Sequence, residues 1–175
     1  MNVMDRFKTW ETHEVKAAVQ AEALPYAVCM MQIVGDYNFS TIVRNANAFG
    51  AREVYYWGPS RRWDRRGAVG MHHYTDVIHI SLGDHDTLNS LRKRYKHFIA
   101  ADIVEGVSTD LRDHQWRDDT LIFFGEEGCG LPLDVLGMCD AVVHIPQMGC
   151  VRSINVGTSA GVFMYDYMIR NGRSR

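Results

Sequence analysis

Short apolar runs of strand length alternate along the chain with segments whose apolar residues recur every three or four positions. The runs lie at 27–31, 53–57, 75–80, 97–101, 120–124 and 141–145, and the helical patterns at 38–49, 84–94, 131–138 and 153–169. Most of these runs carry apolar residues at consecutive positions rather than at every second one, and such strands are buried on both faces. The pattern predicts an α/β fold with a mostly parallel sheet that is flanked by helices.

The length of 175 residues suits one domain of this kind. Residues 1–24 are more polar, and we expect them to form an N-terminal helical segment that docks on the body or on a partner. Residues 25–175 are then the α/β domain. The hydrophobic fraction of 46% and the charged fraction of 23% are ordinary for a globular protein and exclude bulk disorder.

The charge balance limits the class of partner. Lysines and arginines total 19 and acidic residues 21, so a net charge of -2 excludes a uniformly basic nucleic-acid coat but not a local basic patch. No apolar run is long enough to cross a membrane, and residues 1–14 lack the apolar core of a signal peptide. The four cysteines match no zinc framework, so we expect no metal, four buried free thiols and a cytoplasmic location.

Two short segments concentrate positive charge. Residues 60–67 read Ser-Arg-Arg-Trp-Asp-Arg-Arg-Gly and follow a Gly-Pro break, which predicts a loop or arm. Arginines can pair with phosphates and a tryptophan can stack on an unpaired base, so this arm is a candidate RNA-binding element; the alternative is a solvated surface loop. Its candidate contacts are Arg61, Arg62, Trp63, Arg65 and Arg66. The second cluster, at 92–96, lies near a helix C-terminus, where cations are also favoured by the helix dipole.

Three further stretches hold the candidate chemistry. In 37–50, Asn38 can cap the helix. Arg44 is the only cation of that helix and is a candidate functional residue; the alternative is an ordinary arginine on the helix surface. In 124–132, three glycines and two carboxylates follow a buried strand, an arrangement suited to an uncharged or cationic ligand but equally to a plain turn. In 144–157, a Pro/Gly loop leads to Ser153 and Asn155 at a helix start, where capping is the structural explanation. Loops that follow parallel strands lie at the ligand-binding edge of such sheets.

Together the three stretches resemble the SpoU/TrmH-like branch of the SPOUT methyltransferases. The family patterns are N-x-G-x-x-x-R-x-A-x-x-F-G, F-G-x-E-G-x-G-L and I-P-x-x-G-x-x-x-S-L-N-V. This chain matches them at Asn38, Arg44, Ala46, Phe49 and Gly50; at Phe124, Gly125, Glu127, Gly128, Gly130 and Leu131; and at Ile145, Pro146, Gly149, Ser153, Asn155 and Val156. It departs from them at two positions: Ser40 stands where the pattern has Gly, and Ile154 stands where it has Leu. Glu126 lies at a variable position that is often filled by Asn.

The resemblance implies an α/β fold with a C-terminal trefoil knot whose loops bind S-adenosylmethionine, and an active site formed across a homodimer. It implies methyl transfer to ribose 2'-hydroxyls of RNA; the small size favours tRNA over rRNA. The implied catalytic residues are Asn38, Arg44, Glu127, Ser153 and Asn155. The implied cofactor-binding residues are Phe124, Gly125, Gly128, Ile145, Met148, Gly149, Ser153 and Ile154.

Chemistry narrows the roles of these residues and leaves two other functions open. A guanidinium has a pKa above about 12, so we expect Arg44 to bind a phosphate and stabilise oxyanion charge rather than to act as the base. Asn38 is expected to position Arg44 or the substrate, and Glu127 to orient the dimer-related arginine or fix the loop. The alternatives are a non-catalytic RNA-binding protein on the same fold and a methyltransferase that acts on a base.

Overall fold

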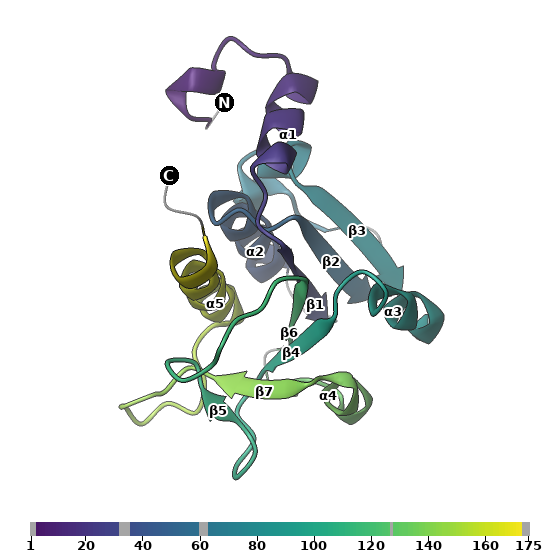
Figure 1. Cartoon of the computed structure of the whole chain (residues 1–175), viewed down its shortest axis with the longest axis vertical. Coiled ribbons are helices and arrows are strands. Elements are labelled where there is room, and N and C mark those ends of the chain that lie inside the picture. Colours follow the sequence, from purple (N-terminus) through teal and green to yellow (C-terminus); the bar gives the residue numbers. More distant parts are fainter. Residues whose placement is uncertain (1–2, 32–35, 60–62, 127, 173–175) are drawn as a thin grey trace.

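The computed structural model describes residues 3–31, 36–59, 63–126 and 128–172. Within these ranges the strands form one sheet in the order β3-β2-β1-β6-β4-β7-β5, with every neighbouring pair parallel (Figure 1). The strands are β1 (Tyr26–Met31), β2 (Glu53–Gly58), β3 (Asp76–Ser81), β4 (His97–Ala101), β5 (Thr109–Asp110), β6 (Thr120–Phe124) and β7 (Ala141–His144). The predicted α/β class with a parallel sheet is confirmed.

Helices cover both faces of this sheet. The α-helices are α1 (Thr12–Ala21), α2 (Asp36–Ala48), α3 (His85–Leu91), α4 (Leu133–Met138) and α5 (Val156–Asn171), with short 3-10 helices η1 (Asp5–Phe7), η2 (Arg66–Ala68) and η3 (Met71–His73). Helices α2 and α5 lie on one face, and α3 and α4 lie on the other (Figure 1). No helix within the described ranges is long and apolar enough to span a membrane.

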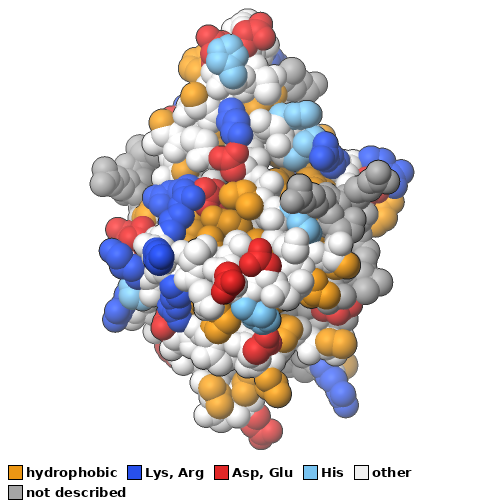
Figure 2. Space-filling model, turned by 90° about the vertical axis from the view of Figure 1, so that its right-hand side faces the viewer, with side chains coloured by type: hydrophobic (Ala, Val, Ile, Leu, Met, Phe, Trp, Pro, Cys, Tyr) orange, Lys and Arg blue, Asp and Glu red, His pale blue; other side chains and the backbone are white. Residues whose placement is uncertain are grey.

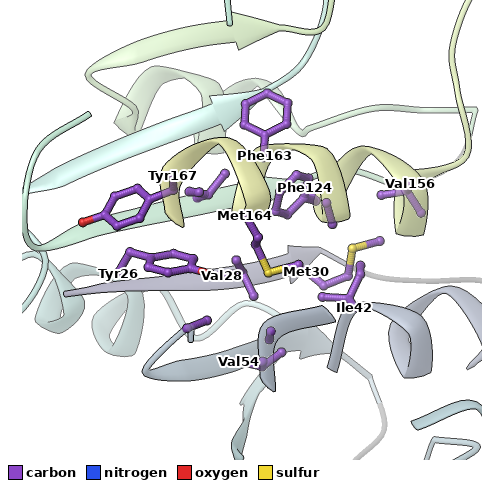
Figure 3. Packing of buried hydrophobic residues seen from close by; sticks show 14 of the residues in the cluster. Tyr26, Val28, Met30, Ile42, Val54, Phe124, Val156, Phe163, Met164 and Tyr167 are labelled. Carbon is purple, nitrogen blue, oxygen red and sulfur yellow. The ribbon is translucent and has the colours of Figure 1, made fainter. Parts of the chain in front are cut away.

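Alternate residues of the central strands supply two separate cores. In β1, Tyr26, Val28 and Met30 pack under α2 and α5 beside Phe163, Met164 and Tyr167 (Figure 3). Ala27, Cys29 and Met31 point the other way, toward α3 and α4. This two-sided burial is why the runs in the sequence carry apolar residues at consecutive positions rather than at every second one.

Helices α2 and α5 approach each other closely because α5 carries glycines at the contact. A Cβ on Gly161 would lie 2.9 Å from Asn45 Nδ2, and Asn45 Nδ2 donates to the Gly157 carbonyl over 3.2 Å. Both helices begin at the carboxyl edge of the sheet. Their packing therefore brings the first residues of α2 near those of α5.

The N-terminal segment docks on the body of the chain. Phe7 and Val15 are buried against Met71 and Tyr74 of the η3 region. Lys16 Nζ lies 2.5 Å from Asp76 Oδ1. Of the two expectations for residues 1–24, docking on the body therefore holds for the described part of this segment.

The second basic cluster is tied into the fold by ion pairs. Arg94 Nη2 lies 2.6 Å from Oε1 of the buried Glu53, which also accepts hydrogen bonds from the hydroxyls of Tyr55 (2.5 Å) and Tyr95 (2.7 Å). Burial and these bonds raise the pKa of both tyrosines. Arg92 Nη1 pairs with Asp140 at 2.6 Å. These contacts favour the structural explanation of the cluster.

The structure differs from the sequence-based prediction at several element ends. Asn38 lies inside α2 rather than at its cap, so the predicted capping role is wrong. Helix α5 begins at Val156, with Asn155 as its N-cap, so Ser153 lies before the helix. Strand β5, Thr109–Asp110, has no counterpart among the runs that the sequence predicted. Strand order does not test the trefoil knot, which stays a prediction.

Candidate active site at the carboxyl edge of the sheet

The three candidate stretches meet at one edge of the sheet. Strands β1, β6 and β7 run parallel, so the segments that follow them leave from the same edge. Helix α2 follows β1, the glycine-rich loop 125–132 follows β6, and the loop 145–155 follows β7. This is the edge at which open α/β sheets bind their ligands.

Besides the bond from Asn45 to the Gly157 carbonyl, a hydrogen bond between two side chains joins the first stretch to the third. Asn155 Nδ2 donates to Asn38 Oδ1 over 2.8 Å, across 117 positions of sequence. Asn155 Oδ1 accepts from the Thr158 amide over 3.1 Å, as an N-cap does. The cap fixes the Asn155 side chain, and that side chain in turn orients the amide of Asn38. The two asparagines form the clearest polar pair at this edge.

The glycine-rich loop folds back on itself through its main chain. Glu126 N donates to Gly130 O (3.2 Å), and Gly130 N donates to Glu126 O (3.0 Å). Gly130 has a φ of +69°, and a Cβ on Gly125 would lie 2.3 Å from the carbonyl carbon of Gly130. The glycines are therefore required by a left-handed turn and by backbone contact.

An aspartate that the sequence analysis did not single out holds this loop in place. Asp102, just after β4, accepts hydrogen bonds from the amide of Leu131 at Oδ2 (3.0 Å) and from the amide of Ile103 at Oδ1 (2.7 Å). The signal in the sequence was a lone carboxylate directly after a predicted buried strand. Asp102 thereby connects the end of β4 to the end of the glycine-rich loop.

The loop after β7 is open to solvent in part and contains an unpaired polar atom. Met148 is 99% exposed, and Gly149 and Ser153 are exposed, whereas Ile145 and Ile154 are half-buried. Gln147 Oε1 is buried without a hydrogen-bond partner in the described part of the chain. A buried acceptor of this kind fits a ligand with an N–H donor, such as the exocyclic amine of adenine. The residues of this loop are thus compatible with an adenosyl cofactor.

The other predicted cofactor residues come from the glycine-rich stretch. The Phe124 side chain is buried in the core against Phe163, at a ring-centroid distance of 5.6 Å. Only its main chain can therefore face a ligand. Gly125 is half-buried and Gly128 is exposed, with a φ of +100° at Gly128. Glu127 lies outside the described residues.

Arg44 does not lie with the asparagine pair. It is six residues beyond Asn38 on α2, which places it about 9 Å further along the axis and about a third of a turn around the helix. It is exposed on the same outward face as Tyr37, Thr41 and Ala48. Arg44 also lines a groove of about 1370 Å³ that the N-terminal segment and the end of α5 border.

The basic arm is tied to α2 over the part that is described. Arg61 and Arg62 lie outside the described residues. Trp63 is half-buried, with its ring 4.8 Å from that of Phe39, and the Arg65 guanidinium is 5.8 Å from the Trp63 ring. Arg66 is exposed and pairs with Asp64 at 2.5 Å.

Two departures from expectation lie close to this site. The hydroxyl of Ser40, where the family pattern has glycine, donates to the Asp64 carbonyl and so links α2 to the arm. The expectation that all four cysteines are buried is wrong for Cys129 and Cys150, which are exposed in the two loops. Cys29 is buried, which raises the pKa of its thiol, and the half-buried Cys139 has its thiol pKa raised to about 12, mainly by burial.

Comparison with known proteins connects this geometry to a family. Residues 25–165 match the profile of the SpoU rRNA Methylase family. The chain is 30% identical over 142 residues to the tRNA (guanosine(18)-2'-O)-methyltransferase of Escherichia coli K12. The aligned region covers 79% of this chain and 61% of that protein. The chain therefore spans about three fifths of the length of this curated relative.

Solved structures share the fold of this chain. The A. aeolicus TrmH/SpoU tRNA modifying enzyme matches with a TM-score of 0.80 at 18% identity, over 91% of this chain and 82% of that one. The SpoU methyltransferase AviRb from Streptomyces viridochromogenes, in complex with the cofactor AdoMet, matches with a TM-score of 0.77 at 21% identity. The match covers 87% of this chain and 60% of that one. These likenesses show a shared fold, and the profile match covers most of the chain. The chain belongs to the SpoU rRNA Methylase family.

Proposed function

We propose that this chain is an S-adenosylmethionine-dependent RNA methyltransferase that methylates a ribose 2'-hydroxyl, with tRNA favoured over rRNA. The observation that carries the proposal is the hydrogen bond between Asn38 and Asn155, at the same edge of the sheet as the glycine-rich loop. It unites two of the three stretches on which the family resemblance rests. The name of the E. coli relative, a tRNA 2'-O-methyltransferase, supports the same reaction and RNA class.

The cofactor supplies a methyl group on a sulfonium sulfur, and the protein supplies alignment and electrostatics. The main chain of Phe124, Gly125 and Gly128 forms one side of the proposed cofactor site. Residues 145–154 form the other side, with contacts from Ile145, Met148, Gly149, Ser153 and Ile154. The unpaired Gln147 Oε1 would accept a hydrogen bond from the adenine amine. Asp102 fixes the first side through the Leu131 amide.

The asparagine pair is placed to orient the reacting hydroxyl. Because Asn155 is held by its capping bond, it fixes the amide of Asn38, and together they can hold a ribose oxygen in line with the group to be transferred. Ser153, exposed just before α5, can donate a further hydrogen bond to the ribose or the cofactor. The role proposed for Glu127 is to fix the loop or to orient an arginine.

We assign to Arg44 the stabilisation of oxyanion charge and the binding of the adjacent phosphate, in the active site of a second protomer. The placement of Arg44 away from its own Asn38 supports a composite site. The outward side of α5 supports a homodimer, because Val162, Tyr165 and Ile169 are 39%, 50% and 54% exposed. They follow one helical stripe beside the outward face of α2, and exposed apolar stripes of this kind are typical of interfaces.

We propose that the basic arm contributes the RNA contacts through Arg61, Arg62, Trp63, Arg65 and Arg66. Its link to α2 through Ser40 supports this role, because it holds the arm beside the helix that carries Asn38 and Arg44. Trp63 would stack on a base with whichever part of its ring is not packed on Phe39. We further propose that the enzyme acts in the cytoplasm and that no membrane takes part.

Isothermal titration calorimetry with S-adenosylmethionine separates this proposal from a non-catalytic RNA-binding protein. We expect one cofactor site per protomer. Nucleoside mass spectrometry of RNA treated with the enzyme then separates ribose from base methylation. Absence of cofactor binding, or a methyl group on a base, contradicts the proposed reaction.

A further inference from the structure

An exposed tyrosine stands in the first turn of α2, directly before the asparagine that bonds to Asn155. Tyr37 is 66% exposed, whereas its neighbour Asn38 is half-buried and receives the 2.8 Å hydrogen bond from Asn155. A single exposed aromatic ring is common on protein surfaces and is not by itself a site. The groups that surround the ring decide what it can bind.

Contacts between α2 and α5 place Tyr37 beside the asparagine pair. Thr41 follows Tyr37 by one turn on the same stripe of α2, and its Oγ1 donates to the Tyr37 carbonyl over 3.0 Å. A Cβ on Gly157 of α5 would lie 3.2 Å from Thr41 Cβ and 3.2 Å from Asn155 Oδ1. Thr41 and Asn155 therefore meet at one point of α5, and Tyr37 lies one turn of α2 before that point.

The described part of the basic arm also reaches Tyr37. The Arg66 guanidinium carbon lies 6.0 Å from the centroid of the Tyr37 ring, and Nη2 donates to the Tyr37 hydroxyl over 3.4 Å. The arm packs closely on the helix here, because a Cβ on Gly67 would lie 2.7 Å from Ser40 Cβ and 3.8 Å from the Tyr37 carbonyl oxygen. The guanidinium is thus held at the hydroxyl end of the tyrosine ring.

An ion pair orients this guanidinium toward solvent. Nε and Nη2 of Arg66 donate to Asp64 Oδ2 over 2.8 and 2.5 Å, and the Arg66 amide donates to Asp64 Oδ1 over 2.9 Å. The side chain of Arg66 is 80% exposed and that of Asp64 only 18%, so the cation faces outward and the carboxylate lies beneath it. A planar cation that is held in this way can bind a phosphate or lie against a base.

The distribution of charge gives an aromatic contact added weight. On the face shown in Figure 2, lysine and arginine side chains are interspersed with acidic and uncharged ones and do not form one continuous basic surface. The net charge of -2 agrees with this picture. An RNA bound by such a chain needs local contacts in addition to electrostatic attraction. Stacking of a base on an aromatic ring is a contact of that kind, and it does not depend on charge.

Building on the proposed function, we infer that Tyr37 stacks on an unpaired base of the bound RNA next to the reacting ribose, with Arg66 at the edge of the stack. The ring is exposed, Arg66 contacts its hydroxyl end, and it adjoins the asparagine pair that is proposed to orient the 2'-hydroxyl. Every base has a π-face, so this contact positions the RNA without selecting the base. The exposed arginines Arg65 and Arg66 on the adjacent arm favour a partner that carries phosphates over a second protomer.

The test compares three variants at this position by the anisotropy of fluorescein-labelled total tRNA, measured at several salt concentrations. Tyr37→Ala and Tyr37→Leu remove the ring, and we expect them to bind tRNA about tenfold or more weakly. Tyr37→Phe keeps the ring and should stay within about threefold of the unaltered chain. The slope of log affinity against log salt should be the same in all of them, because stacking on a tyrosine releases no counterions.

Trp10→Ala is the matched control. Trp10 is also an exposed aromatic residue, but it belongs to the N-terminal segment, which lies beyond the end of the sheet where β1 begins (Figure 1). This variant should bind tRNA as the unaltered chain does. All variants at position 37 should keep the affinity for S-adenosylmethionine in calorimetry and the oligomeric state in light scattering. In the methyl-transfer assay, Tyr37→Ala should raise the KM for tRNA more than it lowers kcat.

Three results would overturn the inference: unchanged tRNA affinity in Tyr37→Ala, a loss in Tyr37→Phe as large as in Tyr37→Ala, or a change of oligomeric state in Tyr37→Ala, which would assign the ring to a subunit interface. Failure of the proposed function looks different. A chain whose tRNA binding depends on the ring of Tyr37 but which transfers no methyl group contradicts the proposed reaction. Methylation of a ribose together with full tRNA affinity in Tyr37→Ala contradicts only the role of Tyr37.

Discussion

Replacing Asp102 by alanine tests whether the glycine-rich loop must be held in place for the cofactor to bind. The carboxylate joins the end of β4 to this loop through the Leu131 amide at 3.0 Å. Leu131 is 5% exposed, so water cannot readily replace the lost acceptor. Asp102→Ala therefore leaves a buried amide unpaired and releases the C-terminal end of the loop.

The magnitude follows from the bond that is lost. A hydrogen bond to a charged group contributes about 1.5–3 kcal/mol, and we take about 2 kcal/mol for this one. If the loop must be restored to this position when the cofactor binds, that energy is subtracted from the binding free energy. At about 1.4 kcal/mol per tenfold change, the dissociation constant rises about 30-fold. Asp102→Asn keeps one oxygen acceptor and should give a smaller rise.

Calorimetry with S-adenosylmethionine measures this effect, and Asp84→Ala provides the matched control. Asp84 also accepts bonds from a backbone amide and a hydroxyl, those of Thr87 at 2.9 and 2.6 Å, but it caps α3 and does not contact the loop. The control should lose stability to a similar extent and bind the cofactor normally. If Asp102→Ala folds and binds the cofactor as tightly as the unaltered chain, the reasoning about the loop is refuted.

Four further predictions concern the reaction, the RNA, the dimer and pH. Arg44→Ala should lower methyl transfer about 100-fold or more with cofactor affinity kept, and normal turnover would reject the role of Arg44. Alanines at all four arginines of the basic arm should reduce the slope of log affinity for RNA against log salt by up to about 3; an unchanged slope would exclude the arm from the interface. Tyr165→Glu, on the outward stripe of α5, should give monomers by light scattering at micromolar concentration, and an unaltered chain that is already monomeric would argue against the composite site. Burial first, and then Arg170, lower the pKa of His114 in the folded chain. The contribution of His114 to stability is therefore full above about pH 6.5 and is lost as pH falls, so His114→Gln should flatten the fall in melting temperature between about pH 7 and 5. An equally steep fall in the variant would assign the loss of stability to other groups.

The sequence predicted the sheet well because both of its faces are buried. Residues 27–31 and 121–124 are apolar at every position, and they lie in the neighbouring strands β1 and β6. Strand β5 was missed because it has two residues, Thr109 and Asp110, and no apolar pattern of its own. Pairing with the end of β7, rather than local propensity, makes that segment extended.

The candidate site was predictable in its membership and less so in its geometry. The motifs placed Asn38 and Asn155 in one site, and the structure joins them directly. Helical spacing separates Arg44 from Asn38 on α2, but it could not show which of the two residues lies toward α5, because that depends on how the two helices pack. Nor could local sequence connect Asp102 with Leu131, because these two residues come together only when the strands are aligned in the sheet.

The most direct test of the proposed function is methyl transfer from labelled S-adenosylmethionine to total tRNA and, separately, to total rRNA, with the modified linkage mapped by its resistance to alkaline hydrolysis. The account predicts incorporation into tRNA, at a 2'-O-methyl linkage on a single type of nucleotide. Incorporation into a base, or no incorporation into either RNA by a chain that binds the cofactor, would contradict it.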